Sequence, residues 1–393
     1  MTIAALVGWV LGLGLSLAGQ APASRDQPIS PAQLKAAIDN LGKFEAPIRT
    51  AAARTVRRTP SAQALPALME AAAGHADGYV RFRALVLLSG FNDPRARESM
   101  ATALDDPNDR LRTVAYAYFE HNVERGMAAR LLKKLDKEDG EFVRPALTRA
   151  LAAYGDEASV QTVLSGLVAR GQDLYRSAVI EALGDYKAAY AVDAISAISK
   201  LDGPLQDDAA LTLGKIGAPR ALETLAGLQQ SVPRQTQASV AAAICLLGVN
   251  CGSHEGYLIN SLKFSDQNVG FQELLRSAAA GLGALAVAGR VESAEALIQI
   301  GIPSRDPTRA PVALALATVA LRNTPLMLKL LESPDRSADR AKAIALMAEG
   351  FDMLEEDLDK ERFFALVRRT YWESPENSPR RGLMQNLIGT LDF

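Results

Sequence analysis

A short motif recurs along the chain at intervals of 30 to 32 residues, and this period limits the possible folds more than any other feature of the sequence. The motif is an apolar residue at the start of a helical pattern, followed in its first four copies by an arginine. The apolar anchor falls at Val80, Leu111, Val143, Tyr175 and Leu205. Periods of about 20 to 50 residues are typical of repeat architectures, in which each unit contacts its neighbours.

The residues that follow each anchor have the period of an α-helix. Apolar side chains stand at the anchor and four, five and eight residues later, on one face of a helix. A second set of amphipathic segments alternates with these helices: 95–104, 126–135, 157–168 and 219–228. The unit is therefore helix, turn, helix. Because a helix of about ten residues cannot bury its apolar stripe alone, neighbouring units must stack.

The segment LTLGKIGAPRALETL at 211–225, with the Asp-Gly-x-Val-Arg turns before it, resembles HEAT repeats, in particular the short bacterial form also found in phycobilisome lyases. The resemblance covers residues 31–350 and implies an all-α fold, a right-handed, armadillo-like α-solenoid of about ten helix pairs. Beyond residue 350 the sequence is more charged, and terminal repeats need a polar outer face. We therefore interpret residues 351–393 as a C-terminal helical cap.

The composition agrees with a helical protein that does not bind nucleic acid. Alanine is abundant and aromatic residues make up 6% of the chain, which favours helices over strands. The 43 Lys and Arg residues are balanced by 45 Asp and Glu, and no block of like charge appears. A nucleic-acid-binding arm or groove would need such a basic block.

The N-terminal residues predict export. Residues 1–19 are uncharged and apolar, and a polar, proline-containing stretch follows. Small residues at Ser16-Leu17-Ala18 and at Ala21-Pro22-Ala23 suit a signal peptidase, although no Lys or Arg stands near Met1. We expect a cleaved signal peptide over 1–23, a linker over 24–30, and a periplasmic or secreted protein. The alternatives are an uncleaved membrane anchor and a misassigned start.

The arginine of the motif needs a partner, because a cation in the first turn of a helix is unfavourable. The turn acids are suitable, since the guanidinium fork matches a carboxylate. We predict a ladder of Asp–Arg pairs between repeats, and this structural interpretation is preferred to a catalytic or phosphate-binding loop. The ladder comprises Asp77, Arg81, Asp109, Arg112, Asp139, Arg144, Asp173 and Arg176.

The residues that carry chemistry in enzymes are scattered. The histidines His75, His121 and His254 lie far apart in the sequence, whereas metal and acid–base sites need a cluster. HEAT-type di-iron hydroxylases carry several His-Glu pairs, and this chain has one, at His254-Glu255. Nucleophile-elbow, Walker and His-Glu-x-x-His motifs are absent from the sequence. We expect no catalytic residues, no metal and no cofactor.

Cys245 and Cys251 form the one local pair of chemically reactive side chains. Gly248 between them should reverse the chain and bring the sulfurs together. In an oxidising compartment the two form a disulfide; otherwise one is a buried thiol and the other a loop thiol. A metal set with His254 is the least favoured alternative, since a fourth ligand is not identified.

The resemblance to HEAT solenoids implies that the second helix of each pair lines a concave face, with residues two, three and six after the anchor pointing into it. The candidate binding residues are Phe82, Arg83, Arg149, Ala178, Glu181, Asp207 and Asp208. Their small size and mixed charge favour a protein or peptide partner and a non-enzymatic scaffold. The alternatives are a cofactor or chromophore lyase or chaperone of the phycobilisome-lyase type, and a purely structural part of an envelope assembly.

Overall fold

The computed structural model describes residues 27–393. The predicted signal peptide at 1–23 and residues 24–26 of the predicted linker lie outside the described residues.

Within residues 27–393 the chain forms 22 α-helices, two short 3₁₀ helices and no strand. The helices are α1 (Pro31–Asn40), α2 (Ala46–Arg58), α3 (Ser61–Gly74), α4 (Gly78–Gly90), α5 (Ala96–Ala103), α6 (Asp109–His121), α7 (Met127–Leu135), α8 (Val143–Ala152), α9 (Ala158–Leu167), α10 (Asp173–Asp185), α11 (Val192–Ser199), α12 (Gln206–Ile216), α13 (Ala221–Ser231), α14 (Arg234–Leu246), α15 (Cys251–Gln267), α16 (Gln272–Val287), α17 (Val291–Gly301), α18 (Arg309–Arg322), α19 (Thr324–Glu332), α20 (Arg340–Met353), α21 (Asp357–Glu373) and α22 (Pro379–Leu391). The 3₁₀ helices are η1 (Ala189–Ala191) and η2 (Pro334–Arg336).

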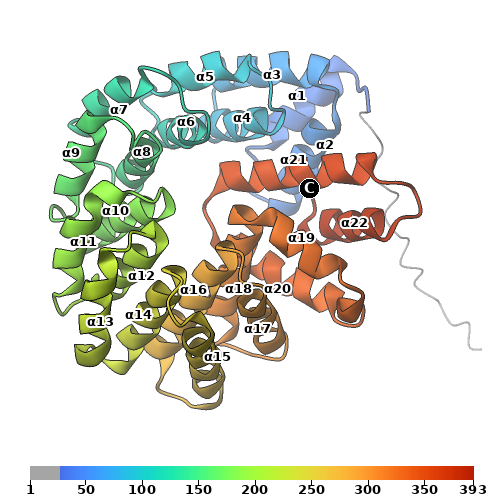
Figure 1. Cartoon of the computed structure of the whole chain (residues 1–393). Coiled ribbons are helices and arrows are strands. Elements are labelled where there is room, and N and C mark those ends of the chain that lie inside the picture. The colour runs from blue at the N-terminus through green and yellow to red at the C-terminus, as the bar shows by residue number, and fades with distance from the viewer. Residues whose placement is uncertain (1–26) are drawn as a thin grey trace, which may run out of the picture.

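The helices form two concentric layers (Figure 1). The even-numbered helices from α4 to α20 make the inner layer, and each packs against the next even-numbered helix. The odd-numbered helices from α3 to α15 lie outside them. The ten pairs from α1/α2 to α19/α20 confirm the predicted all-α solenoid of about ten helix pairs.

The row of pairs curves until its two ends meet (Figure 1). Helix α21 packs against α4 and α6 near the start of the chain, and also against α18 and α22 near its end. The solenoid is therefore closed into a ring. The predicted cap at 351–393 comprises the end of α20 with α21 and α22; α21 lies against the inside of the ring and keeps Arg362, Arg369 and Glu373 exposed.

Local sequence signals start the first helix as expected. Ser30 accepts a hydrogen bond from the backbone N–H of Gln33, whose side chain accepts one from the N–H of Ser30. Pro31 stands at the first helical position, where its missing N–H costs nothing. This capping box fixes the direction in which α1 leaves the N-terminal segment.

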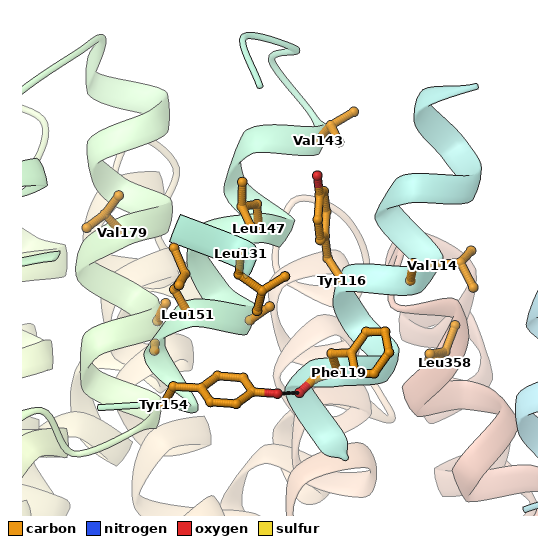
Figure 2. Packing of buried hydrophobic residues seen from close by; sticks show 14 of the residues in the cluster. Val114, Tyr116, Phe119, Leu131, Val143, Leu147, Leu151, Tyr154, Val179 and Leu358 are labelled. Carbon is orange, nitrogen blue, oxygen red and sulfur yellow. Dashed lines mark hydrogen bonds between the residues drawn. The ribbon is translucent and has the colours of Figure 1, made fainter. Parts of the chain in front are cut away.

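The anchors and the apolar residues that follow them form the core between the two layers. Figure 2 shows Tyr116 and Phe119 of α6 packed near Leu147 of α8, all three completely buried. Burying one such side chain stabilises the fold by about 1.5 to 3 kcal/mol. The Tyr154 hydroxyl reaches back across one repeat and donates to the backbone carbonyl of Phe119 at 3.0 Å (Figure 2).

The buried apolar residues form two clusters that meet on α14. The first runs from Leu34 to Ile244, and the second from Ala238 to Phe393. Leu358 is the exception: it stands on α21, yet it belongs to the first cluster. Its neighbours along α21, Phe363 and Val367, belong to the second. Helix α21 therefore touches both cores, and it does so at the seam where the ring closes.

The motif arginines do have partners, but several partners differ from those predicted. Arg112 donates to both carboxylate oxygens of Glu138, at 2.7 and 2.8 Å, and this bond lowers the pKa of Glu138. Arg81 pairs with Asp106, and Arg176 pairs with Asp173 at 2.9 Å. Arg81 and Arg112 thus reach an acid in the turn that follows their own repeat.

Four residues of the predicted ladder do not form the predicted ion pairs: Asp77, Asp109, Asp139 and Arg144. Asp77 caps α4 by accepting from the N–H of Tyr79, and Asp109 accepts from the N–H of Arg110. No bond from a motif arginine to Asp139 is found in the described part of the chain. The Arg144 guanidinium lies 4.6 Å from the centre of the Tyr175 ring, so an aromatic face replaces the expected carboxylate. Only Arg81 and Arg112 therefore form ion pairs that join neighbouring repeats, because the Arg176–Asp173 pair lies within the first turn of α10.

Among the described residues, no single helix is both long enough and apolar enough to cross a membrane. Helices α18 and α19 meet the length and composition test only when taken together, and they are bent by 111° relative to each other.

We predict that Arg112→Ala lowers the free energy of unfolding by about 2 to 3 kcal/mol, because it strands the buried carboxylate of Glu138. Arg144→Ala should cost less, since it strands no carboxylate. Arg97→Ala is the control: its pair with Glu124 is exposed, and its loss should stay within about 1 kcal/mol. Thermal melting followed by circular dichroism measures all three, and equal shifts for Arg112→Ala and Arg97→Ala would contradict the structural role of the motif.

Candidate functional site

The inner face of the ring carries most of the charged side chains that the sequence placed on a concave surface. These residues stand two, three and six positions after each anchor, on one side of α4, α8, α10 and α12. The structure divides them into three groups: those under α21, those in a charge network between α6 and α12, and an acidic group at α10 and α12.

The first group lies under α21. The Arg83 guanidinium is 3.2 Å from the carboxylate of Asp357, the first residue of α21. Phe82 is half-buried, and the Arg83 guanidinium lies 5.6 Å from the centre of its ring. These two predicted binding residues are therefore already occupied by the chain itself.

One turn further along α21, Glu361 makes the most buried contact of the seam. Arg57 of α2 donates to both of its carboxylate oxygens, one of them at 2.9 Å. The two side chains are 8% and 4% exposed, so this pair is almost removed from water. Gly90 at the end of α4 permits the approach, because a Cβ there would lie 3.2 Å from a Glu361 oxygen.

Asp359 of α21 connects the two ends of the ring. It lies 3.0 Å from His121 at the end of α6 and 3.3 Å from Arg322 at the end of α18. Arg322 also holds Glu356 at 2.7 Å. Burial alone would raise the pKa of Asp359, but the contacts with His121 and Arg322 outweigh it and lower that pKa to about 2. The carboxylate is therefore ionised throughout the physiological range.

The second group is a charge network around Arg149. Its guanidinium is 2.9 Å from Glu120 of α6 and 2.9 Å from Asp185 of α10. Lys215 of α12 also reaches Asp185, and the Tyr186 hydroxyl donates to Glu120 at 2.7 Å. Burial would lower the pKa of Arg149, but the two carboxylates outweigh it and raise that pKa. Arg149 is thus a fixed cation and not a free contact for a partner.

The third group is acidic. Ser177 donates to Asp208, and Ser277 of α16 donates to Asp207 at 2.7 Å. Glu181 is exposed on the same side of α10, next to the partly buried Ala178. Burial raises the pKa of Asp208, and the neighbouring charges of Glu181 and Asp207 raise it further, against the effect of the Ser177 bond. The three acids therefore create a locally negative surface.

The structure brings Ala178, Glu181, Asp207 and Asp208 together and separates them from Phe82 and Arg83, which α21 covers. The sequence reasoning missed the partners of Arg149 and the acids of α21. A signal for the first was present: Glu120 and Asp185 stand nine and ten residues after their anchors, on the continuation of the same helical face. Nothing local marks residues 357–361 as partners of helices 250 residues earlier.

The histidines and carboxylates of the described residues are not arranged for metal binding. His75 lies beside Asp39, His121 lies beside Asp359, and burial lowers the pKa of His254. In residues 27–393 no group of three or more His, Cys, Asp or Glu side chains is placed to hold a metal ion.

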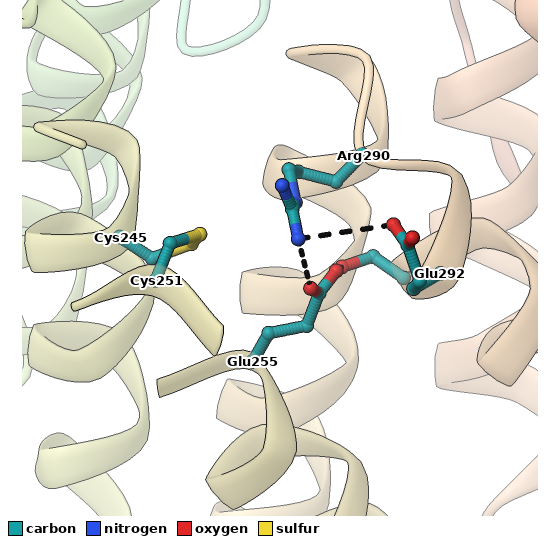
Figure 3. The surroundings of a disulfide bond; sticks show 6 residues. Cys245, Cys251, Glu255, Arg290 and Glu292 are labelled. Atoms are coloured by element: carbon teal, nitrogen blue, oxygen red, sulfur yellow. Dashed lines mark hydrogen bonds and ion pairs between the residues drawn. A yellow bond between two sulfur atoms is a disulfide. The ribbon is translucent and has the colours of Figure 1, made fainter. Parts of the chain in front are cut away.

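Cys245 at the end of α14 and Cys251 at the start of α15 are joined by a disulfide (Figure 3). The intervening Gly248 has a positive φ of 80°, as the reversal of the chain requires. The bridge excludes the alternative in which both sulfurs bind a metal with His254. Beside it, Glu255 accepts hydrogen bonds from Arg290 and Ser293 and so ties α15 to the next pair (Figure 3).

Away from the inner face of the ring, a separate hollow of about 700 Å³ lies at the ends of α11, α12 and α13. It is lined by Lys200, Asp202, Glu223 and Ser231, among others. Its lining is mixed, since Leu228, Val232 and Pro233 also contribute, and none of the candidate binding residues belongs to it.

Comparisons with known proteins agree with the repeat. A family model described as HEAT repeats matches residues 34–119, which form α1 to α6. No protein of the curated set matches the chain.

Several solved structures are similar at low identity. The complex of CpcE and CpcF of phycocyanin lyase from Nostoc sp. PCC7120 has 18% identity, covers 85% of this chain and 98% of that chain, and gives a TM-score of 0.26. Kap95p, solved in a study of its binding to RanGDP, has 13% identity, 92% and 51% coverage and a TM-score of 0.29. Kap121p has 15% identity, 92% and 46% coverage and a TM-score of 0.31. This chain thus spans about half the length of the last two.

These superpositions are poor over whole chains, and the fold follows from the helix pairs themselves. HEAT repeats are matched over residues 34–119, and the same stacked pair continues to α20, so the chain is a solenoid of HEAT-type repeats.

Proposed function

We propose that this protein is an exported, non-enzymatic scaffold that binds a protein or peptide segment on the inner face of the ring, over α10 and α12. One observation carries this proposal: Glu181, Asp207 and Asp208 form an acidic patch beside the small side chain of Ala178. Helix α21 covers the inner surface at α4. The Arg149 network occupies the inner surface toward α6.

The charge of the patch favours a basic segment. Burial raises the pKa of Asp208, and the neighbouring charges of Glu181 and Asp207 raise it further, although Ser177 and Lys215 act in the opposite direction. A Lys or Arg of a partner would relieve this repulsion, and complementary charge of this kind speeds association and selects among partners. The partner is therefore expected to carry at least one cationic side chain at the contact.

The small residues of the patch support access by a backbone. Close packing between inner helices relies on other positions: a Cβ at Gly214 would lie 2.3 Å from Ala243 Cα, and one at Gly350 would lie 2.1 Å from the Ala313 oxygen. Ala178 is partly exposed and belongs to neither contact. Crowding between repeats thus explains the glycines at positions 214 and 350. It does not involve Ala178, whose small side chain is available to a ligand.

The aromatic residues that a lyase pocket would need are engaged elsewhere. Tyr116 is fully buried, and its hydroxyl donates to Glu138 at 3.0 Å. Phe82 packs with Tyr79, with ring centres 5.7 Å apart. These contacts favour the scaffold over the lyase alternative.

The double variant Ala178→Arg with Glu181→Lys tests the binding surface. It adds bulk and reverses the charge at sites that are not part of the core, so the melting temperature should stay within about 2 °C, because exposed substitutions change stability by about 0.5 kcal/mol or less. Capture of the native partner from the envelope fraction should be lost. Arg97→Ala, on the far side of α5, serves as the matched control.

A variant that melts early would show that packing explains the small residues. A variant that melts normally and still captures the same partner would place the binding surface elsewhere.

Export is tested by N-terminal sequencing of the native protein. The mature chain should begin between Gly19 and Ser24, because the apolar block ends in small residues that a signal peptidase accepts. The Cys245–Cys251 bridge supports this location, since disulfides persist in oxidising compartments. A chain that still begins at Met1 in the cytosolic fraction would contradict export.

A further inference from the structure

The seam that closes the ring, here named the clasp, is the contact of α21 with α2, α4 and α6. Its centre is ionic: Glu361 meets Arg57, Asp357 meets Arg83, and Asp359 meets His121. The first of these pairs joins residues 304 positions apart in the chain. The clasp therefore presents a surface with two arginines and a histidine to the acidic start of one helix.

Helix α21 contributes unequally to the two apolar cores. Leu358 is buried in the N-terminal core, whereas Phe363, Val367 and Tyr371 are buried in the C-terminal core. Helix α21 is thus anchored to its own end of the chain and touches the other end mainly through charged groups. Desolvation offsets much of the attraction of a buried ion pair, so such a contact gives more specificity than stability.

The clasp can separate without unfolding a repeat. In a solenoid each pair depends on its neighbours, and the two cores remain joined through α14 when α21 leaves α4. Separation leaves Arg57, Arg83 and His121 without partners on a concave face. Basic side chains without partners, next to a partly apolar surface, favour a ligand that resembles α21. Such a ligand carries acidic residues with an apolar residue between them.

We propose that the inner surface of α2, α4 and α6 is a docking site for an acidic amphipathic helix of a partner protein, and that α21 occupies this site until that helix displaces it. This inference rests on the proposed binding role of the inner face and adds a second, basic surface to it. A partner helix that carries acids spaced as Asp357 and Glu361 are, with an apolar residue between them, matches the chemistry of the site.

A second copy of this chain is a less suitable occupant. Only residues 354–356 connect α20 to α21, and a segment of three residues spans at most about 10 Å. Helix α22 also packs against α19 and α20, which holds the C-terminal pair in place. An exchange of α21 between copies would have to break these contacts as well.

The probe for this site is a fluorescent peptide with the sequence of residues 355–374, and the protein is the full mature chain. In the opened variant, Asp357→Arg with Glu361→Arg, α21 is repelled while the docking surface is unchanged. We expect this variant to bind the peptide at least tenfold more tightly than the wild type in fluorescence anisotropy. Its radius of gyration in small-angle X-ray scattering should increase. Adding Arg57→Glu should abolish the gain. The new carboxylate at position 57 attracts the arginine introduced at position 361 of the chain and repels the Glu361 carboxylate of the peptide.

A locked variant provides the second measurement. Cysteines introduced as Gly90→Cys and Glu361→Cys would have their Cβ atoms about 3.7 Å apart, within the range of a disulfide. The oxidised form should not bind the peptide, and the reduced form should. The wild type treated with the same reductant controls for loss of the Cys245–Cys251 bridge.

Two results would overturn the proposal: an opened variant with a larger radius that binds the peptide no better than the wild type, and an oxidised locked variant that binds the peptide as its reduced form does. If the opened variant dimerises without peptide, the occupant of the site is α21 of a second copy. This result would overturn the assignment of the site to a partner protein. These measurements use purified components, so their failure leaves the acidic patch untouched. Loss of partner capture in Ala178→Arg with Glu181→Lys remains an independent test of that patch.

Discussion

Every feature of this protein depends on the inability of one short helix pair to bury its own apolar stripe. An inner helix such as α6 gains a core only when α8 covers it on one side and α4 on the other. Stacking then sets the spacing of the inner helices and brings successive turns side by side, which is why Arg81 and Arg112 reach acids of the following turn. It also aligns one face of every inner helix toward the same space, so that charges distant in sequence meet there.

The charges inside the ring form a connected system. Arg149 is shared by Glu120 and Asp185, and Arg322 is shared by Glu356 and Asp359. Each carboxylate in these clusters is satisfied by a cation from another helix, so the clusters add ionic contacts between helices that already share an apolar core. The acidic patch at Glu181, Asp207 and Asp208 differs because two of its carboxylates accept from serine hydroxyls, whereas Lys215 and Arg149 act on Asp208 and Glu181 only through their charge. That difference is what separates a structural cluster from a surface suited to a ligand.

The sequence predicts the repeat well because the period is local: the anchors and the arginines stand in plain order, and the solenoid is confirmed. The disulfide was one of three outcomes considered for a local cysteine pair, and it is the one found. Partners across space were predicted less well. Arg144 meets the ring of Tyr175, a residue that the repeat analysis had treated only as an anchor. Closure was missed entirely, because a contact between Arg57 and Glu361 depends on the summed curvature of ten pairs and not on any short stretch of sequence.

Closure of the ring also changes how the solenoid is held together thermodynamically. In an open row of repeats the first and last units have one neighbour each, so they fray before the interior does. Here the first pairs and α21 cover each other, and the row has no free end in the described part of the chain. Contacts that join residues 304 positions apart close a long loop of chain, so we expect ring closure to follow the assembly of the intervening repeats. The molecule therefore combines units that assemble locally, one after another, with a final contact that makes their stability collective.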